Sequence, residues 1–134
     1  MIGVRKYLKE GEFNREAERA FAFVREFGFF GPERGEDRVA FSSGRLGVEI
    51  MYDDRDGRVI TIVRAYLAER NPRAGLGCLY VQAGLGPQQD VRDIARSAKQ
   101  LPASLESQAA AFRKLLPALS GVDGPDLLLR CHGR

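Results

Sequence analysis

Three acidic residues in one short stretch are the first candidates for chemistry. Asp53, Asp54 and Asp56 carry carboxylate oxygens of the kind that hold a divalent cation. A calcium loop of the EF-hand type needs a Glu at its twelfth position, but this chain has Arg64 there when counted from Asp53. We therefore predict that the acidic stretch is the turn of a hairpin, closed by Gly57, and not a calcium site.

Other patterns that resemble catalytic or cofactor-binding motifs are incomplete. Gly75 and Gly77 begin like a dinucleotide-binding fingerprint, but Tyr80 stands where the third glycine is required. His132 is the single histidine, so a multi-histidine metal site is excluded, and its neighbour Cys131 is badly placed to form a Cys/His nucleophilic pair with it. We expect no cofactor and no metal, and we expect a non-enzymatic protein. A pair of carboxylates brought together only in space stays open.

The two cysteines and the hydropathy bear on the cellular compartment. Cys78 and Cys131 are far apart and form no Cys-x-x-Cys pattern, which favours reduced, packed thiols over a disulfide. No apolar run approaches the roughly 18–20 residues of a membrane span, and the first residues lack the apolar segment of a secretory signal. We expect a cytoplasmic protein without a membrane contact.

The composition predicts one folded domain with an ordinary surface. The 134 residues are 44% hydrophobic and 29% charged, which is enough apolar material for a core. The net charge is only +3, and the arginines alternate with acids, as in residues 14–19. Such mixing is typical of a solvated surface and not of a nucleic-acid footprint.

Strand patterns dominate the middle of the chain. Residues 46–52 alternate large apolar side chains with Gly47, Glu49 and Met51, as in a half-buried strand. Residues 59–63 are apolar on both faces, which predicts a strand that is covered on both sides or central in the sheet. Residues 38–42 add a first strand with Val39 and Phe41 inward, and a three-stranded meander results. We expect Glu49 to pair across the sheet with Arg64 or Arg45.

Helical periodicity occurs on both sides of these strands. Residues 13–27 form an amphipathic helix with Asn14 as N-cap and Gly28 as its stop, and this helix should lie across the sheet. Phe27 belongs to its inward face. We expect further helices at 1–11, 90–98, 104–119 and 124–129, with a break near Leu101 and Pro102, an end or kink at Pro117, and the last helix docked by its leucines.

The remaining segments are expected to be less regular. After Gly28, residues 29–30 predict a short strand or turn, followed by a polar loop at 31–37. Residues 78–81 predict a fourth strand inside a glycine-bearing loop that runs from 75 to 86. Loops of this kind often carry function.

Residues 21–29, the meander at 39–53 and the helical C-terminal half together resemble small bacterial α+β proteins, some of them similar to the immunity proteins of toxin systems. The likeness spans residues 13–119 in outline and transfers no functional residue, because its motifs concern the fold. It implies an α+β fold and binding to another protein.

The leading prediction is a single α+β domain, with an antiparallel three- to four-stranded meander sheet packed by an N-terminal amphipathic helix and C-terminal helices. We expect a protein–protein interaction module of the inhibitor or immunity type, present as a monomer or small homo-oligomer. The candidate partner-binding residues are Glu49, Met51, Asp53, Asp54, Asp56, Tyr80 and Gly84.

Two alternatives stay open. The first is a nucleic-acid-binding accessory protein that uses the arginines and a sheet surface near Tyr66, although Tyr52 shares the inward face and is expected in the core. The second is a ligand-binding protein or enzyme, with a pocket between helices and sheet. That pocket would be lined by Phe residues and Tyr80 and closed by the loop at 75–86.

Overall fold

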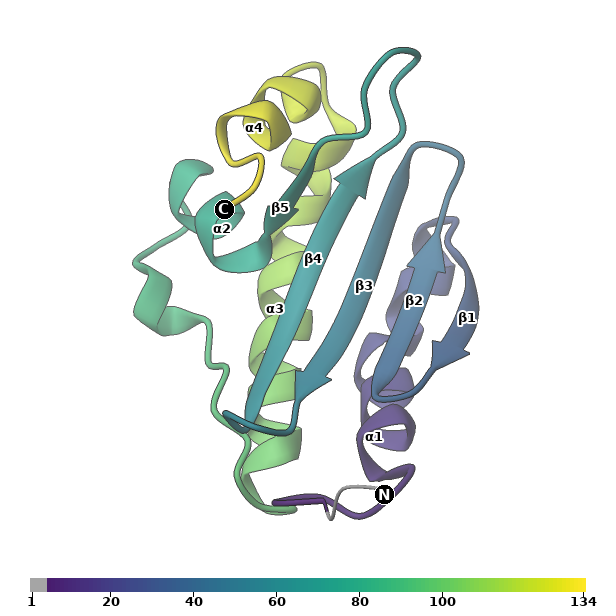
Figure 1. The fold of residues 1–134 in the computed structure, drawn as a ribbon. Coiled ribbons are helices and arrows are strands. Elements are labelled where there is room, and N and C mark those ends of the chain that lie inside the picture. The colour runs from purple at the N-terminus through teal and green to yellow at the C-terminus, as the bar shows by residue number, and fades with distance from the viewer. Residues whose placement is uncertain (1–4) are drawn as a thin grey trace.

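The computed structural model describes residues 5–134 and contains a five-stranded antiparallel sheet. The strand order is β1-β2-β3-β4-β5, so each strand pairs with its neighbours in the chain (Figure 1). The strands are β1 (Phe30–Gly35), β2 (Arg38–Ser42), β3 (Leu46–Asp53), β4 (Arg58–Ala65) and β5 (Arg73–Gly75). The helices are α1 (Glu12–Phe21), α2 (Leu76–Gln82), α3 (Gln100–Ser120) and α4 (Gly124–Arg130), with 3-10 turns η1 (Ala22–Phe27) and η2 (Gln88–Asp90).

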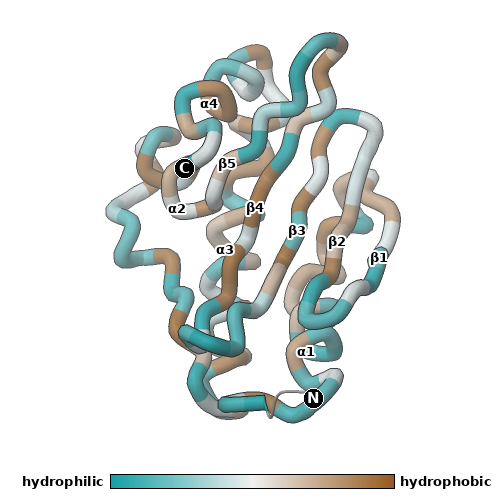
Figure 2. Tube along the Cα trace, in the orientation of Figure 1, coloured by the Kyte–Doolittle hydropathy of each residue, from teal (hydrophilic) through white to brown (hydrophobic). Residues whose placement is uncertain are grey.

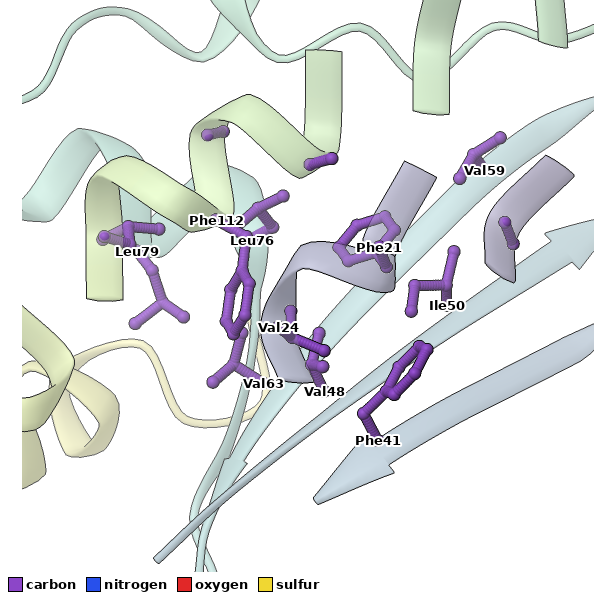
Figure 3. Close-up of a cluster of buried hydrophobic side chains, with 14 of the residues drawn as sticks. Phe21, Val24, Phe41, Val48, Ile50, Val59, Val63, Leu76, Leu79 and Phe112 are labelled. Carbon is purple, nitrogen blue, oxygen red and sulfur yellow. The ribbon is translucent and has the colours of Figure 1, made fainter. Parts of the chain in front are cut away.

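The helices cover one face of this sheet. In Figure 1, α1 and α3 lie behind the strands, and the face turned to the viewer carries no helix. Aromatic and aliphatic side chains fill the space between the layers, among them Phe21 from the N-terminal helix, Phe112 from α3 and Ile50 from the sheet (Figure 3). The predicted α+β meander with an N-terminal helix and C-terminal helices is confirmed.

The central hairpin is the one that the alternation predicts. Val48 is paired with Val63, and every second residue of β3 from Leu46 onward is buried. The connection at 54–57 is a tight, hydrophilic turn (Figure 2), in which Gly57 has φ 64° and the Asp53 carboxylate accepts the Arg55 N–H at 3.0 Å. The predicted turn is therefore confirmed.

The strand β1 replaces the polar loop predicted at 31–37. It pairs with β2 through an irregular register and contains Pro32, which the position tolerates because β1 is an edge strand. Side chains from the helical segment occupy its free carbonyls. Asn14 Nδ2 donates to Gly35 O at 2.8 Å, and Arg25 Nε donates to Gly31 O at 3.1 Å. Asn14 is therefore not the N-cap of α1, which begins at Glu12.

The N-terminal helix tightens part of the way along its length. Residues 22–27 form a 3-10 turn, and Gly28 ends it with φ 86°, as predicted. A 3-10 turn has three residues per turn instead of 3.6, so later side chains rotate out of the α-helical stripe. Phe27 is accordingly 47% exposed, and the prediction that it faces the core is wrong. The helix predicted at 1–11 is absent from residues 5–11, and residues 1–4 lie outside the described part of the chain.

Two segments after the meander differ from the prediction. Residues 78–81 belong to the helix α2 and not to a fourth strand, because Leu76, Leu79 and Tyr80 are buried at helical spacing. The sheet instead gains β5, which pairs Ala74 with Val63. Residues 91–98 form no helix, since their backbone bonds to α3 and the sheet instead.

The helices of the C-terminal half agree more closely with the sequence. The helix α3 begins at Gln100 and includes Pro102 in its first turn, where a missing N–H costs nothing, so the predicted break is wrong. It continues past Pro117 to Ser120. In α4, the buried Leu127 and Leu128 dock on the core as predicted.

A disulfide joins Cys78 in α2 to Cys131, which directly follows α4. The expectation of reduced thiols is wrong, because the fold brings the two Cα atoms to 6.0 Å across a separation of 53 residues. Disulfides persist mainly in oxidising compartments. Cytoplasmic location therefore stays a prediction. None of the helices within residues 5–134 has the length and hydropathy of a membrane span.

Candidate functional site

One face of the sheet is covered by no helix of the described chain (Figure 1), and we call it the open face. Its centre is apolar. Ile60 is 39% exposed, and Ile62 and Met51 are half-buried beside it. Of the two alternatives predicted for β4, covered on both sides or central in the sheet, the second is confirmed, because β4 is an interior strand between β3 and β5 and one of its faces is uncovered. The missed signal is the alternation along the strand, because Ile60 and Ile62 lie on the same side of β4 as the exposed Arg58 and the half-buried Arg64.

Glu49 lies on the open face as predicted, but with a different partner. The β2–β3 register places Glu49 opposite Ala40, and Arg38 reaches it diagonally from β2 in an ion pair. The predicted partners, Arg64 and Arg45, do not pair with it. Arg64 stands opposite Gly47, and no carboxylate within residues 5–134 lies at ion-pair distance from it. The guanidinium of Arg64 is thus available to an outside group.

Tyr66 extends the open face beyond the end of β4. Its ring lies over Gly47, where a side chain would collide with the phenol. Together with Arg38, Glu49, Ile62 and Arg64, the ring borders a hollow of about 70 Å³. That volume is roughly the space of two water molecules. The hollow is therefore too small for a metabolite.

The aspartates of the acidic turn form hydrogen bonds within the fold. The Asp53 carboxylate accepts N–H groups of the turn, and the Asp54 carboxylate accepts the Lys6 N–H at 3.0 Å. The Asp56 carbonyl accepts a bond from Arg96 Nε at 3.2 Å. Within residues 5–134 no group of three or more His, Cys, Asp or Glu side chains is placed to hold a metal ion.

Tyr80 and Gly84 lie away from the open face. Tyr80 is buried in α2, which packs on α3, and its hydroxyl bonds to the Asp90 carboxylate at 3.3 Å. Burial, reinforced by Asp90, raises the pKa of the Tyr80 hydroxyl. Gly84 closes α2 with φ 74°. The structure thus gathers Glu49, Met51 and Asp53 on one face and leaves the other candidates outside it.

A cavity of about 550 Å³ opens at the end of the sheet where β2 turns into β3 and β4 leaves for β5. We call it the end cavity. Of the residues predicted to line a pocket between helices and sheet, Phe27 and Phe29 line this cavity and Tyr80 does not. Residues 66–68 of the β4–β5 connection form part of its wall, in place of the predicted loop at 75–86.

The chain matches no protein-family model, and no curated protein or solved structure shows significant similarity to it. The resemblance to immunity proteins therefore stays a prediction.

Proposed function

We propose that this chain binds another protein through the open face, in the manner of an inhibitor or immunity protein. The observation that carries the proposal is the exposure of Ile60 in the middle of an interior strand, beside Ile62 and Met51. One face of an antiparallel sheet is commonly solvated, and such a face is usually polar. An apolar centre surrounded by charged side chains has instead the composition of a protein interface.

The charges of the open face indicate the chemistry of the partner. Arg64 and Arg73 stand opposite each other on β4 and β5, and neither forms an ion pair within residues 5–134. Two unpaired guanidinium groups beside an apolar strip fit a partner surface with carboxylates around an apolar centre. We propose that this partner is a different protein.

A nucleic acid fits the open face less well. Sheet surfaces that read RNA stack its bases on two or three aromatic side chains. Of the two tyrosines considered for that role, Tyr66 lies on the open face, and Tyr52 is buried beneath the sheet with its hydroxyl bonded to Ala95 O. A face with one exposed aromatic ring and exposed isoleucine side chains therefore suits a protein partner better than RNA.

A comparison of two substitutions tests the proposal. Ile60→Asp places a charge in the apolar centre, whereas Val122→Asp does the same at a residue that is 96% exposed between α3 and α4. We expect affinity capture from the host lysate to retain one protein on the wild type and on Val122→Asp, and to lose it on Ile60→Asp. Urea unfolding of each variant checks that the fold is intact.

Three results would contradict the proposal. A partner retained equally by both variants would place binding elsewhere, and loss of all partners after nuclease treatment would indicate nucleic acid. If the wild type and Ile60→Asp capture the same proteins, or if neither captures any, the open face is not a binding surface. Arg64→Gln should weaken the captured complex and reduce its salt dependence, because one ion pair is lost.

A further inference from the structure

We propose that the end cavity is a second binding site, which takes a small apolar molecule with a single carboxylate. The cavity volume of about 550 Å³ falls within the roughly 300–1,000 Å³ of small-molecule sites. This site does not depend on the proposed function, because its inner walls lie at the end of the molecule and not on the open face.

The walls of the end cavity are parts of the hydrophobic core. Leu116 and Leu119 come from α3, Leu128 from α4, and Leu46 and Phe29 from the sheet and the segment before it. All five side chains are buried and belong to the main buried cluster. These side chains are only 1–6% exposed, so they form a packed floor of fixed shape beneath the more exposed lining residues.

The lining of the cavity carries one charge. Arg45 is the single charged residue among the lining residues, which include no Asp or Glu. No carboxylate within residues 5–134 lies at ion-pair distance from its guanidinium. Its backbone is anchored, since Arg45 O accepts the Tyr66 N–H at 2.9 Å and Arg45 N donates to Ser43 Oγ at 3.3 Å.

This charge distribution selects the ligand class. A guanidinium binds the two oxygens of a carboxylate through parallel hydrogen bonds. With a single cation in the lining, one negative charge is matched, and the apolar interior excludes further charges. Phe27 and Tyr66 line the same cavity and are 47% and 44% exposed, so a bound apolar body would remove aromatic surface from water.

Decanoate and decanol form a matched pair of probes, because they share the apolar chain and differ in the charged head. We expect ¹H–¹⁵N NMR titration of the full chain with decanoate to shift amide signals of the β2–β3 turn, residues 66–68 and the end of α3. Arg45→Gln should weaken decanoate binding by about tenfold and leave decanol binding unchanged. Arg70→Gln, which removes a charge from an exposed residue outside the cavity lining, is the control.

A blocking variant provides a second test without altering the core. Ser120 is an exposed lining residue, and Ser120→Trp should occupy the mouth and abolish binding of both probes while the thermal unfolding midpoint is preserved. The proposal is overturned if decanoate shifts no cavity signals at millimolar concentration, or if Arg45→Gln and Arg70→Gln weaken it equally. Ile60→Asp should leave decanoate binding intact, so failure of the protein-binding proposal and failure of this one are separate results.

Discussion

The phenol of Tyr66 lies directly over Gly47, so that a Cβ atom at position 47 would stand only 2.6 Å from the Tyr66 hydroxyl oxygen. Gly47 is a strand residue without a positive φ, so glycine is needed here for the space that it leaves to the Tyr66 ring and not for its backbone conformation. The same ring borders the hollow of the open face and lines the end cavity. The Tyr66 side chain is therefore the structural link between the two proposed sites.

A double-mutant cycle measures this contact. Gly47→Ala should destabilise the wild type by about 1 kcal/mol, because overpacking displaces the ring. In a Tyr66→Ala background the same change should be neutral or slightly stabilising, since alanine is better than glycine in a strand. Urea unfolding of the four proteins gives the coupling energy, and equal effects in both backgrounds would show that the two residues do not interact. Gly44→Ala, where a Cβ meets nothing within 4 Å, is the control.

The disulfide should be a major source of stability. Loss of the Cys78–Cys131 bond frees a loop with a sequence separation of 53 residues, and the chain-entropy relation gives a cost of about 4 kcal/mol. We expect dithiothreitol to lower the urea midpoint of the wild type strongly. The variant with Cys78→Ser and Cys131→Ser should start at a low midpoint and not respond to reductant. A wild-type midpoint that is unchanged on reduction would contradict the prediction.

The buried hydroxyl of Tyr52 should make stability depend on pH in the alkaline range. Burial is the main cause that raises its pKa from 10.0 to about 12, and the hydroxyl donates to Ala95 O at 2.6 Å. The folded state holds this proton more tightly than the unfolded state. The stabilising contribution is therefore complete below pH 10 and is lost as pH rises from 10 to about 12.

Tyr52→Phe removes the ionisable group and supplies the comparison. At neutral pH it should cost about 1 kcal/mol for the lost hydrogen bond. Between pH 10 and 12 the wild type should lose stability faster than the variant, so that the difference in unfolding free energy narrows or reverses. Urea unfolding of both proteins between pH 10 and 12 measures this difference, and tyrosinate absorbance measures the ionisation of Tyr52 independently. Parallel pH profiles for the two proteins would show that Tyr52 does not cause the change.

Gln108 should be one of the more sensitive polar positions. Its amide nitrogen donates to Val59 O and to Arg92 O, both at 2.9 Å, and its amide oxygen accepts the Thr61 hydroxyl. Gln108→Leu leaves these buried groups without partners, and we expect a loss of about 2–3 kcal/mol. Hydrogen exchange around residues 91–95 should rise at the same time. Gln82→Leu, at an exposed helical position, should change neither quantity.

The meander and the long C-terminal helix were predictable because each has a clear period. Residues of β3 alternate between buried and solvated positions, and Leu105, Phe112 and Leu119 recur on one side of α3. The run at 78–81 is so short and so uniformly apolar that its pattern fits a helix and a strand equally well, and the prediction of a strand is wrong. Segment 91–98 shows helical spacing but forms no helix, because Gln108 and Tyr52 bind its carbonyls.

The candidate site was predictable in part. Alternation placed Glu49 and Met51 on the wet side of β3, and the structure confirms this placement. Hydropathy alone did not reveal the exposure of Ile60, because an apolar side chain looks the same on either face of a strand. The available signal was its alternation in step with Arg58 and Arg64. Arg45 and Tyr66 meet at the end cavity through the β2–β3 and β4–β5 connections, whose paths depend on the whole sheet.

By itself, the sequence determined the α+β class, the strands of the central hairpins and the inward face of the long helix, since these follow from local periodicity and turn residues. Tertiary structure alone decided the Cys78–Cys131 bond, the Arg38–Glu49 pair, the uncovered sheet face and the end cavity. The physical reason is that local patterns specify which side of an element is apolar. Which element covers that side, and which side is left open, depends on contacts between residues far apart in the chain.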